Sequence, residues 1–219
     1  MISAWGGEMG IDRDILEAAL DAACESTSDA ATHTETPAER DLLNEQWAQS
    51  YIGLALNDMF RQRYSNDKAG YVSFETTVSW LDGYLPAPTK PGPRPGGLTA
   101  RQRFDAVLWS KGGKATGLVE LKDRPFMGRY AESSDPQKLC GGLRRWPTLR
   151  WAMFLFSIRC PAKSKCIDDD LAAKRDDILM RIRKDVGDFW RVSSSKIVPG
   201  RGSRTMWVGV VFRRPGEAD

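Results

Sequence analysis

Residues 103–122, RFDAVLWSKGGKATGLVELK, contain two apolar runs on either side of a glycine-rich turn, with charged residues inside the runs. The runs RFDAVLW and TGLVELK predict two strands, which SKGGKA joins into a hairpin. Asp105, Glu120 and Lys122 stand where a buried strand would carry valine or isoleucine. A buried charge is costly unless it is paired or binds a metal, so we expect these three residues to form a site.

The positions of Asp105, Glu120 and Lys122 in the two strands predict that their side chains lie close together. Side chains alternate across a strand, so Glu120 and Lys122 face the side of their strand that Val119 and Leu121 do not. If Asp105 pairs near Glu120, two carboxylates and one ammonium converge near a strand end. Two close carboxylates do not both ionise without a cation. Mg²⁺ binds through one or two carboxylates, and it can activate water and stabilise charge on a phosphate oxygen.

Composition excludes several other chemistries. The 219-residue chain is long enough for its own core, and its 41% hydrophobic and 28% charged residues are typical of a soluble domain with a net charge of +3. The single histidine, His33, lies in a polar stretch, which argues against imidazole catalysis. The four cysteines lack zinc-site spacing and predict thiols in a reducing compartment. No apolar run has membrane-spanning length and the start lacks signal-peptide features, so we expect a cytoplasmic protein without a membrane partner.

Apolar periodicity organises the rest of the chain. We expect helices over residues 10–24, 37–60, 136–146 and 171–190. We expect further strands over residues 70–86, 151–158, 191–198 and 205–214. The small polar residues of 25–35 predict a flexible linker, and the Gly141-Gly142 pair should weaken its helix. Hairpins combined with a helical crossover predict an α/β fold, in which a mixed sheet carries helices on both faces.

The motif D-x14-E-x-K on adjacent strands, set in the order helix, three strands, helix, strand, resembles the PD-(D/E)xK nuclease superfamily. The likeness covers about residues 37–158, although Phe104 stands where the family motif has proline. It implies a restriction-endonuclease-like αβββαβ core with a mixed central sheet flanked by helices. An N-terminal helix, and a C-terminal helix and β-hairpin, are added to that core. We therefore divide the chain into an N-terminal helical appendage and linker, 1–35, and a nuclease-like domain, 36–219.

The resemblance assigns a role to each residue of the motif. Asp105 and Glu120 would bind the metal, which the carbonyl of Leu121 could join. Lys122 would be the catalytic lysine, positioning water or stabilising the transition state. Many members add a glutamate from the first helix. Glu39 fits a capping box that begins at Thr36, so we favour Glu45 as the catalytic glutamate.

The expected activity is Mg²⁺-dependent phosphodiester hydrolysis, with Mn²⁺ able to substitute and DNA a better substrate than RNA. The alternative is a non-catalytic nucleic-acid-binding or assembly module that keeps the nuclease fold. A third interpretation is an enzyme acting on a small phosphorylated ligand, and a fourth is a structural ion pair. A homodimer would suit the cutting of two strands, and residues 1–35 could contact a protein partner.

Basic residues before and after the hairpin are candidates for contact with nucleic acid, because lysine and arginine near phosphates dominate affinity. Those before or at the start of the hairpin are Lys90, Arg94, Arg101 and Arg103, and those after it are Lys138, Arg144 and Arg145. Trp146 could stack on a base. A solvated, charged surface is the alternative explanation for both groups.

Overall fold

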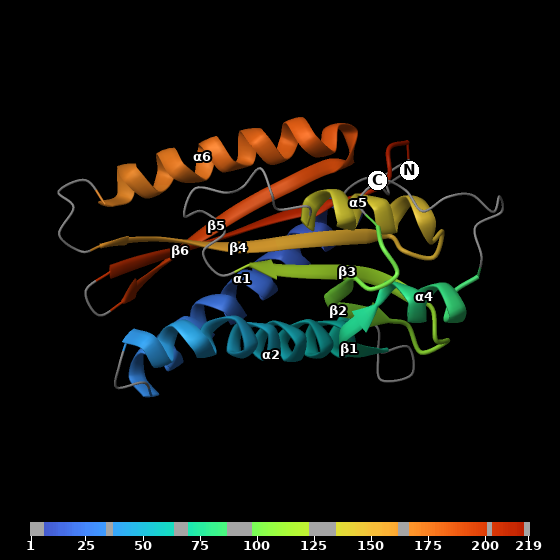
Figure 1. The fold of residues 1–219 in the computed structure, drawn as a ribbon, viewed down its shortest axis with the longest axis horizontal. Coiled ribbons are helices and arrows are strands. Elements are labelled where there is room, and N and C mark those ends of the chain that lie inside the picture. The colour runs from blue at the N-terminus through green and yellow to red at the C-terminus, as the bar shows by residue number, and fades with distance from the viewer. Residues whose placement is uncertain are drawn as a thin grey trace.

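A six-stranded mixed sheet forms the centre of the chain in the computed structural model (Figure 1). The structure describes residues 7–33, 37–63, 70–86, 98–122, 135–161, 167–200 and 203–216. Side chains are described in the same ranges except for residues 7–12, 33, 37–45, 63, 161, 167, 200 and 203.

The sheet has the order β1-β2-β3-β4-β6-β5. Its strands are β1 (Tyr71–Thr77), β2 (Arg103–Trp109), β3 (Ala115–Lys122), β4 (Trp151–Pro161), β5 (Trp190–Gly200) and β6 (Ser203–Phe212). β3 and β4 run parallel, joined through helix α5 (Asp135–Arg145), and every other neighbouring pair is antiparallel. The predicted mixed α/β sheet, with its β2–β3 hairpin and its C-terminal hairpin, is therefore confirmed.

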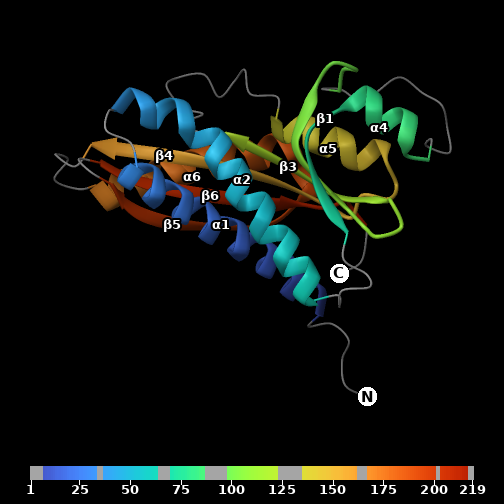
Figure 2. The same cartoon turned by 90° about the horizontal axis from the view of Figure 1, so that it is seen from below.

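Helices cover both faces of the sheet, as predicted. The long helices α1 (Gly7–His33) and α2 (Pro37–Arg63) run antiparallel across one face (Figure 2). Helix α5 and helix α6 (Ile167–Val186) cover the other face, and a single 3-10 turn, η3 (Gly187–Phe189), follows α6. None of the described helices is both long and apolar enough to span a bilayer.

Strand β4 lies inside the sheet and carries the longest apolar run of the chain. Residues 151–158 of this strand are all buried. Phe154 and Phe156 point into the core under α5 and α6, whereas Met153 and Leu155 point into the core under α1 and α2. A strand buried on both faces needs apolar residues at consecutive positions, which is what the sequence carries here.

The predicted linker over 25–35 is wrong for residues 25–33, because α1 continues to His33. Hydroxyl groups in this stretch bond to carbonyls of the preceding turn: Ser26 and Thr27 both donate to the carbonyl of Ala23. Serine and threonine hydroxyls inside a helix can bond to the carbonyl of the preceding turn in this way, so they need not end the helix. Thr27 also accepts a hydrogen bond from the indole of Trp207 in β6 at 2.8 Å, which ties the end of α1 to the sheet.

The strand predicted over 70–86 is wrong beyond Thr77, where helix α4 (Val78–Tyr84) begins. The Thr77 hydroxyl accepts the N–H of Trp80 at 3.2 Å and caps the helix. Val78, Leu81 and Leu85 then fall on one helical face and are buried. That apolar period of three to four residues outweighs the β propensity of the surrounding valine and aromatic residues.

Candidate active site

Asp105 and Glu120 come together at the end of the β2–β3 hairpin. The β2–β3 register pairs Ala106 with Val119, so the next facing positions are Asp105 and Glu120. The carboxylate of Asp105 accepts the backbone N–H of Leu121 at 2.6 Å, and so crosses from β2 to β3. The expected convergence of the two carboxylate positions is therefore present.

A break in the strand alternation places Asp105. Phe104 and Val107 both join the core under α5, although strict alternation would put them on opposite faces. Opposite Asp105 in β1, Glu75 adopts a left-handed backbone conformation with φ of 51°, and these two residues are skipped in the β1–β2 pairing. Irregularities of this kind re-aim side chains at the edges of sheets and beside active sites.

Gln49 of α2 supports this irregular point. Its side-chain amide donates to the backbone carbonyl of Asp105 at 2.6 Å and lies 3.4 Å from the carboxylate of Glu75. The amide thus satisfies a carbonyl that the broken β1–β2 ladder leaves available. Sequence reasoning missed Gln49, since a glutamine inside an amphipathic helix carries no signal of its own.

Glu120 is buried beside the ammonium of Lys138 from α5. The Lys138 Nζ lies 2.7 Å from Glu120 Oε1, and both side chains are less than a tenth exposed. The ammonium also donates to the carbonyl of Arg103 at 2.8 Å and lies 3.7 Å from the carboxylate of Asp135. The 2.7 Å contact with the Lys138 ammonium is therefore the interaction that compensates the buried Glu120 carboxylate.

Burial holds the pKa of Glu120 well above its ordinary value. The ammonium of Lys138 opposes this rise, whereas the nearby charges of Asp105 and Asp135 add to it. Glu120, among three acidic groups and one ammonium, therefore takes up a proton at a higher pH than an exposed glutamate would.

This shift predicts a pH-dependent stability in the absence of metal. The folded protein holds a proton on Glu120 that the unfolded chain releases near pH 4.5, so the stabilisation is complete below that pH. It is lost as the pH rises through the folded pKa, with a limiting slope of about 1.4 kcal/mol per pH unit. Urea unfolding in a chelator from pH 5 to pH 8 should show this decline, and Glu120→Gln should remove it.

Glu17→Gln is the matched control for that series. The hydrogen bond from Lys196, at the surface, lowers the pKa of Glu17, so its contribution is lost only as the pH falls. The Glu17→Gln protein should keep the decline above pH 5. Parallel wild-type and Glu120→Gln curves would contradict the proton on Glu120.

Gly142 explains how α5 approaches the sheet closely enough for Lys138 to reach Glu120. A methyl group added at Gly142 would lie 2.6 Å from the Leu118 side chain in β3, and Leu118 is fully buried. The glycine that was expected to weaken α5 therefore permits its close packing. This packing positions Lys138, one turn earlier in the same helix.

We expect Gly142→Ala to lower the free energy of unfolding by about 1–2 kcal/mol, because overpacking outweighs the gain of roughly 1 kcal/mol in helix propensity. Gly83→Ala in α4 is the matched control, since a methyl group there meets nothing within 4 Å. It should raise stability by roughly 0.5–1 kcal/mol. Chemical denaturation measures the stability change of both variants. Equal stabilisation by the two would show that α5 accommodates a methyl group at position 142 without overpacking.

The other predicted site residues are less closely gathered. Lys122 is exposed at the end of β3, and its side chain has no ion pair or hydrogen bond with a described residue. The backbone N–H of Leu121 donates to the carboxylate of Asp105. Glu45 belongs to α2, but its side chain lies outside the described residues. Lys90 and Arg94 lie outside the described ranges altogether.

The remaining basic residues have varied surroundings. Arg101 is exposed, and Arg103 is exposed with a loose ion pair to Glu75 at 3.8 Å. Arg144 is exposed above the ring of Phe189 at 4.6 Å, whereas Arg145 is mostly buried against Asp82. The stacking role expected for Trp146 is wrong, because only 1% of this residue is exposed.

Two other kinds of site find little support in the part of the chain that the structure describes. Within that part, no group of three or more histidine, cysteine or acidic residues is arranged to hold a metal by protein ligands alone. Burial raises the pKa of the Cys140 thiol to about 12 and that of Cys24 to about 11. Both thiols are therefore poor nucleophiles near neutral pH.

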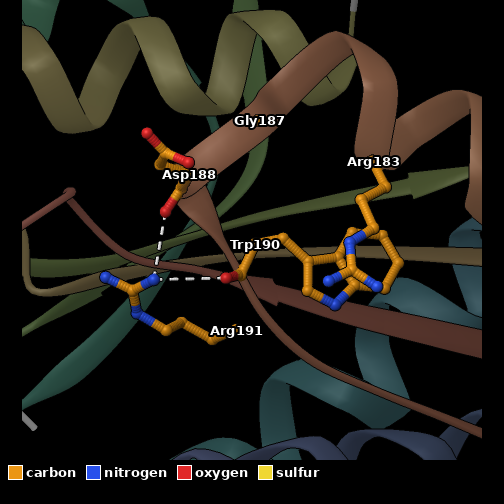
Figure 3. Close-up of a pocket in the computed structure, with 5 residues that line it drawn as sticks. All are labelled: Arg183, Gly187, Asp188, Trp190 and Arg191. Atoms are coloured by element: carbon orange, nitrogen blue, oxygen red, sulfur yellow. Dashed lines mark hydrogen bonds between the residues drawn. The ribbon is translucent and has the colours of Figure 1, made fainter.

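A shallow hollow of about 400 Å³ lies elsewhere, at the turn between α6 and β5 (Figure 3). Arg191 donates to the carbonyls of Asp188 and Trp190 there, and Arg183 lies over the Trp190 ring at 5.9 Å. These arginines stabilise the turn, and no acidic pair accompanies them, so the hairpin end remains the stronger candidate.

No protein-family model matches the chain, and neither curated proteins nor solved structures include a significant match.

Proposed function

We propose that the chain is a metal-dependent nuclease that hydrolyses phosphodiester bonds, with DNA preferred over RNA, at the Asp105–Glu120 site. One observation carries the proposal: the hairpin sets two carboxylates, Asp105 and Glu120, at facing positions at a strand end, and one of them is buried. A further support is the order β1-β2-β3-β4 with a helical crossover into a parallel β4, as the PD-(D/E)xK resemblance implies. The restriction-endonuclease-like identity of this core is part of the same proposal.

The residues present fit a hard divalent cation. Mg²⁺ commonly takes one or two carboxylates and completes its shell with water and substrate phosphate. Asp105 and Glu120 would hold it, with the Leu121 carbonyl as a further oxygen. The bound cation would supply a more acidic water and charge neutralisation at a phosphate oxygen.

The protein groups around the cation have separate tasks in this proposal. Lys138 holds the buried carboxylate of Glu120 in place from α5 and thus acts as a positioning residue. Lys122, exposed at the end of β3, is the ammonium available to a water or to a phosphate oxygen. Gln49 fixes the backbone of Asp105, and Glu45 on the same helix is the proposed assisting carboxylate.

The alternative, a binding or assembly module without catalysis, is favoured by the position of Lys138. Its ammonium already neutralises Glu120, in the manner of a built-in cation. Titration calorimetry with Mn²⁺ separates the two functions. Heat of binding that Glu120→Gln removes supports the nuclease, and its absence in the wild-type protein supports the module.

The proposed function is tested on the purified chain with labelled single-stranded and duplex DNA and with RNA of the same sequence. We expect cleavage in Mg²⁺ or Mn²⁺, no cleavage in excess chelator, and DNA cut faster than RNA. Intact substrates at all metal concentrations, with a protein that is folded by circular dichroism, would refute the proposal.

A further inference from the structure

An exposed group of aromatic side chains lies around Trp109, at the end of β2 away from Asp105. The group consists of Tyr71, Trp80, Tyr84 and Trp109, and is called the aromatic cluster below. Trp109 is 3% exposed, whereas Tyr71, Trp80 and Tyr84 are 48%, 47% and 53% exposed. These three belong to the seven large apolar residues that are exposed among the described residues, so such exposure is unusual for this chain.

The geometry of the cluster is ordered. Trp80 and Tyr84 stack on each other with ring centres 4.8 Å apart and planes within 9° of parallel. Both rings meet Trp109 edge-on, at 5.4 Å and 5.6 Å, while Tyr71 stacks on its face at 5.7 Å. Trp109 is anchored in turn, since its indole N–H donates to the Ser73 hydroxyl at 2.8 Å. The exposed rings are thus held in place before any ligand arrives.

The rings on α4 are only partly used in packing. The buried face of α4 consists of Val78, Leu81 and the following Leu85, whereas Trp80 and Tyr84 contact Trp109 and stay 47% and 53% exposed. A soluble surface would favour polar residues at these two positions. About half of each of these two side chains is therefore accessible to a planar partner.

Basic residues lie at both ends of α4. Its first turn bonds to the segment before β2, where the N–H of Val78 donates to the carbonyl of Gln102 at 2.9 Å, beside the exposed Arg101 and Arg103. Its last residue, Tyr84, meets the β2–β3 turn, because a methyl group at Gly113 would lie 3.2 Å from the Tyr84 hydroxyl. That turn carries the exposed Lys111 and Lys114.

The cluster also has a defined relation to the proposed site. Helix α4 lies on the same side of the sheet as α5, beside β1 (Figure 2). Trp109 is four residues from Asp105 along β2, or about 13 Å in an extended strand. A flexible strand could therefore cross the aromatic cluster and reach the carboxylates in one binding mode.

We propose that the aromatic cluster binds single-stranded nucleic acid, whose bases stack on Trp80 and Tyr84 while its phosphates contact the basic residues at both ends of α4. Bases in a duplex present no free faces to stack, whereas unpaired bases stack on aromatic side chains with little regard to sequence. Positive charge at both ends fits a polyanion better than an apolar protein partner. The inference rests on the proposed function for the link to cleavage, and its binding step stands apart from catalysis.

Fluorescence anisotropy in chelator tests it, because no cleavage occurs there. The probes are a labelled oligodeoxynucleotide, the matching oligoribonucleotide and the duplex. We expect the wild-type protein to bind both single strands more tightly than the duplex. Trp80→Leu with Tyr84→Leu should weaken single-strand binding by at least tenfold and leave duplex binding unchanged. Lys114→Met should reduce the slope of log affinity against log salt by about 0.7.

Two further variants serve as controls. Trp80→Phe keeps a ring and should retain most of the affinity, and Met180→Ala, on an exposed residue of α6, should change nothing. Equal single-strand affinity in the double variant and the wild type would overturn the inference. A wild-type protein that sediments as a dimer, with a double variant that sediments as a monomer, would overturn it as well. Single-strand binding lost in the double variant, with no cleavage by the wild type in metal, refutes the proposed nuclease and leaves the binding surface standing.

Discussion

Asp105→Asn is expected to reduce metal-dependent cleavage by about 10³-fold while the fold stays intact, because a bound cation contributes several kcal/mol to the transition state. Asparagine keeps an oxygen in the position that accepts the N–H of Leu121 at 2.6 Å, so the link from β2 to β3 survives. It lacks the negative charge that a divalent cation needs. Single-turnover rates in Mg²⁺ and Mn²⁺, with thermal melts in chelator, separate the two effects.

Asp58→Asn, an exposed position on α2, is the control for the loss of one negative charge and should cleave as the wild type does. Lys122→Met adds a second comparison, since its exposed side chain should matter for the rate and not for stability. Cleavage that persists in both Asp105→Asn and Lys122→Met would place the active site elsewhere.

Lys138→Met should lower the free energy of unfolding by about 3–5 kcal/mol at pH 8, because it leaves the Glu120 carboxylate buried without its cation. Protonation of Glu120 relieves that cost, so the loss should be smaller at pH 5. Combining Lys138→Met with Glu120→Leu removes both charges from the core and should restore most of the stability. Urea unfolding of the four proteins at both pH values gives the coupling energy.

Lys196→Met is the matched control for this series. Lys196 also contacts two carboxylates, those of Glu17 and Asp21, yet its side chain is 30% exposed. A pair open to solvent contributes about 1 kcal/mol or less. If Lys138→Met lowered the free energy of unfolding no more than Lys196→Met does, the ion pair between Lys138 and Glu120 would contribute no more than an exposed pair.

The hairpin, the apolar β4 and the C-terminal strands could be predicted because each depends on local pattern and turn chemistry. The hairpin pattern allowed a register with Asp105 opposite Glu120, whereas the break in alternation at Asp105 was not predicted. The helix α4 was missed because Thr77 and the three buried aliphatic positions after it compete with a strongly β-like composition. The helical end of α1 was missed because hydroxyl-rich residues normally favour loops, and here they bond within the helix.

The partner of Glu120 was beyond sequence reasoning. Lys138 lies 18 positions along the chain, in a helix whose distance from the sheet depends on a missing methyl group at Gly142. Lys138 was expected to contact phosphate and instead lies buried on Glu120. Gln49 and the left-handed Glu75 likewise depend on how α2 and β1 meet around Asp105.

The contacts of Lys138 have a consequence for the proposed site when no metal is bound. One ammonium links the carbonyl of Arg103 in β2, the carboxylate of Glu120 in β3 and the first turn of α5. Clusters of bare acidic side chains repel one another and loosen when chelators strip their ion. Here the Lys138 ammonium offsets that repulsion. The metal-free protein would therefore keep its structure, and a divalent cation would bind at a site that is already formed.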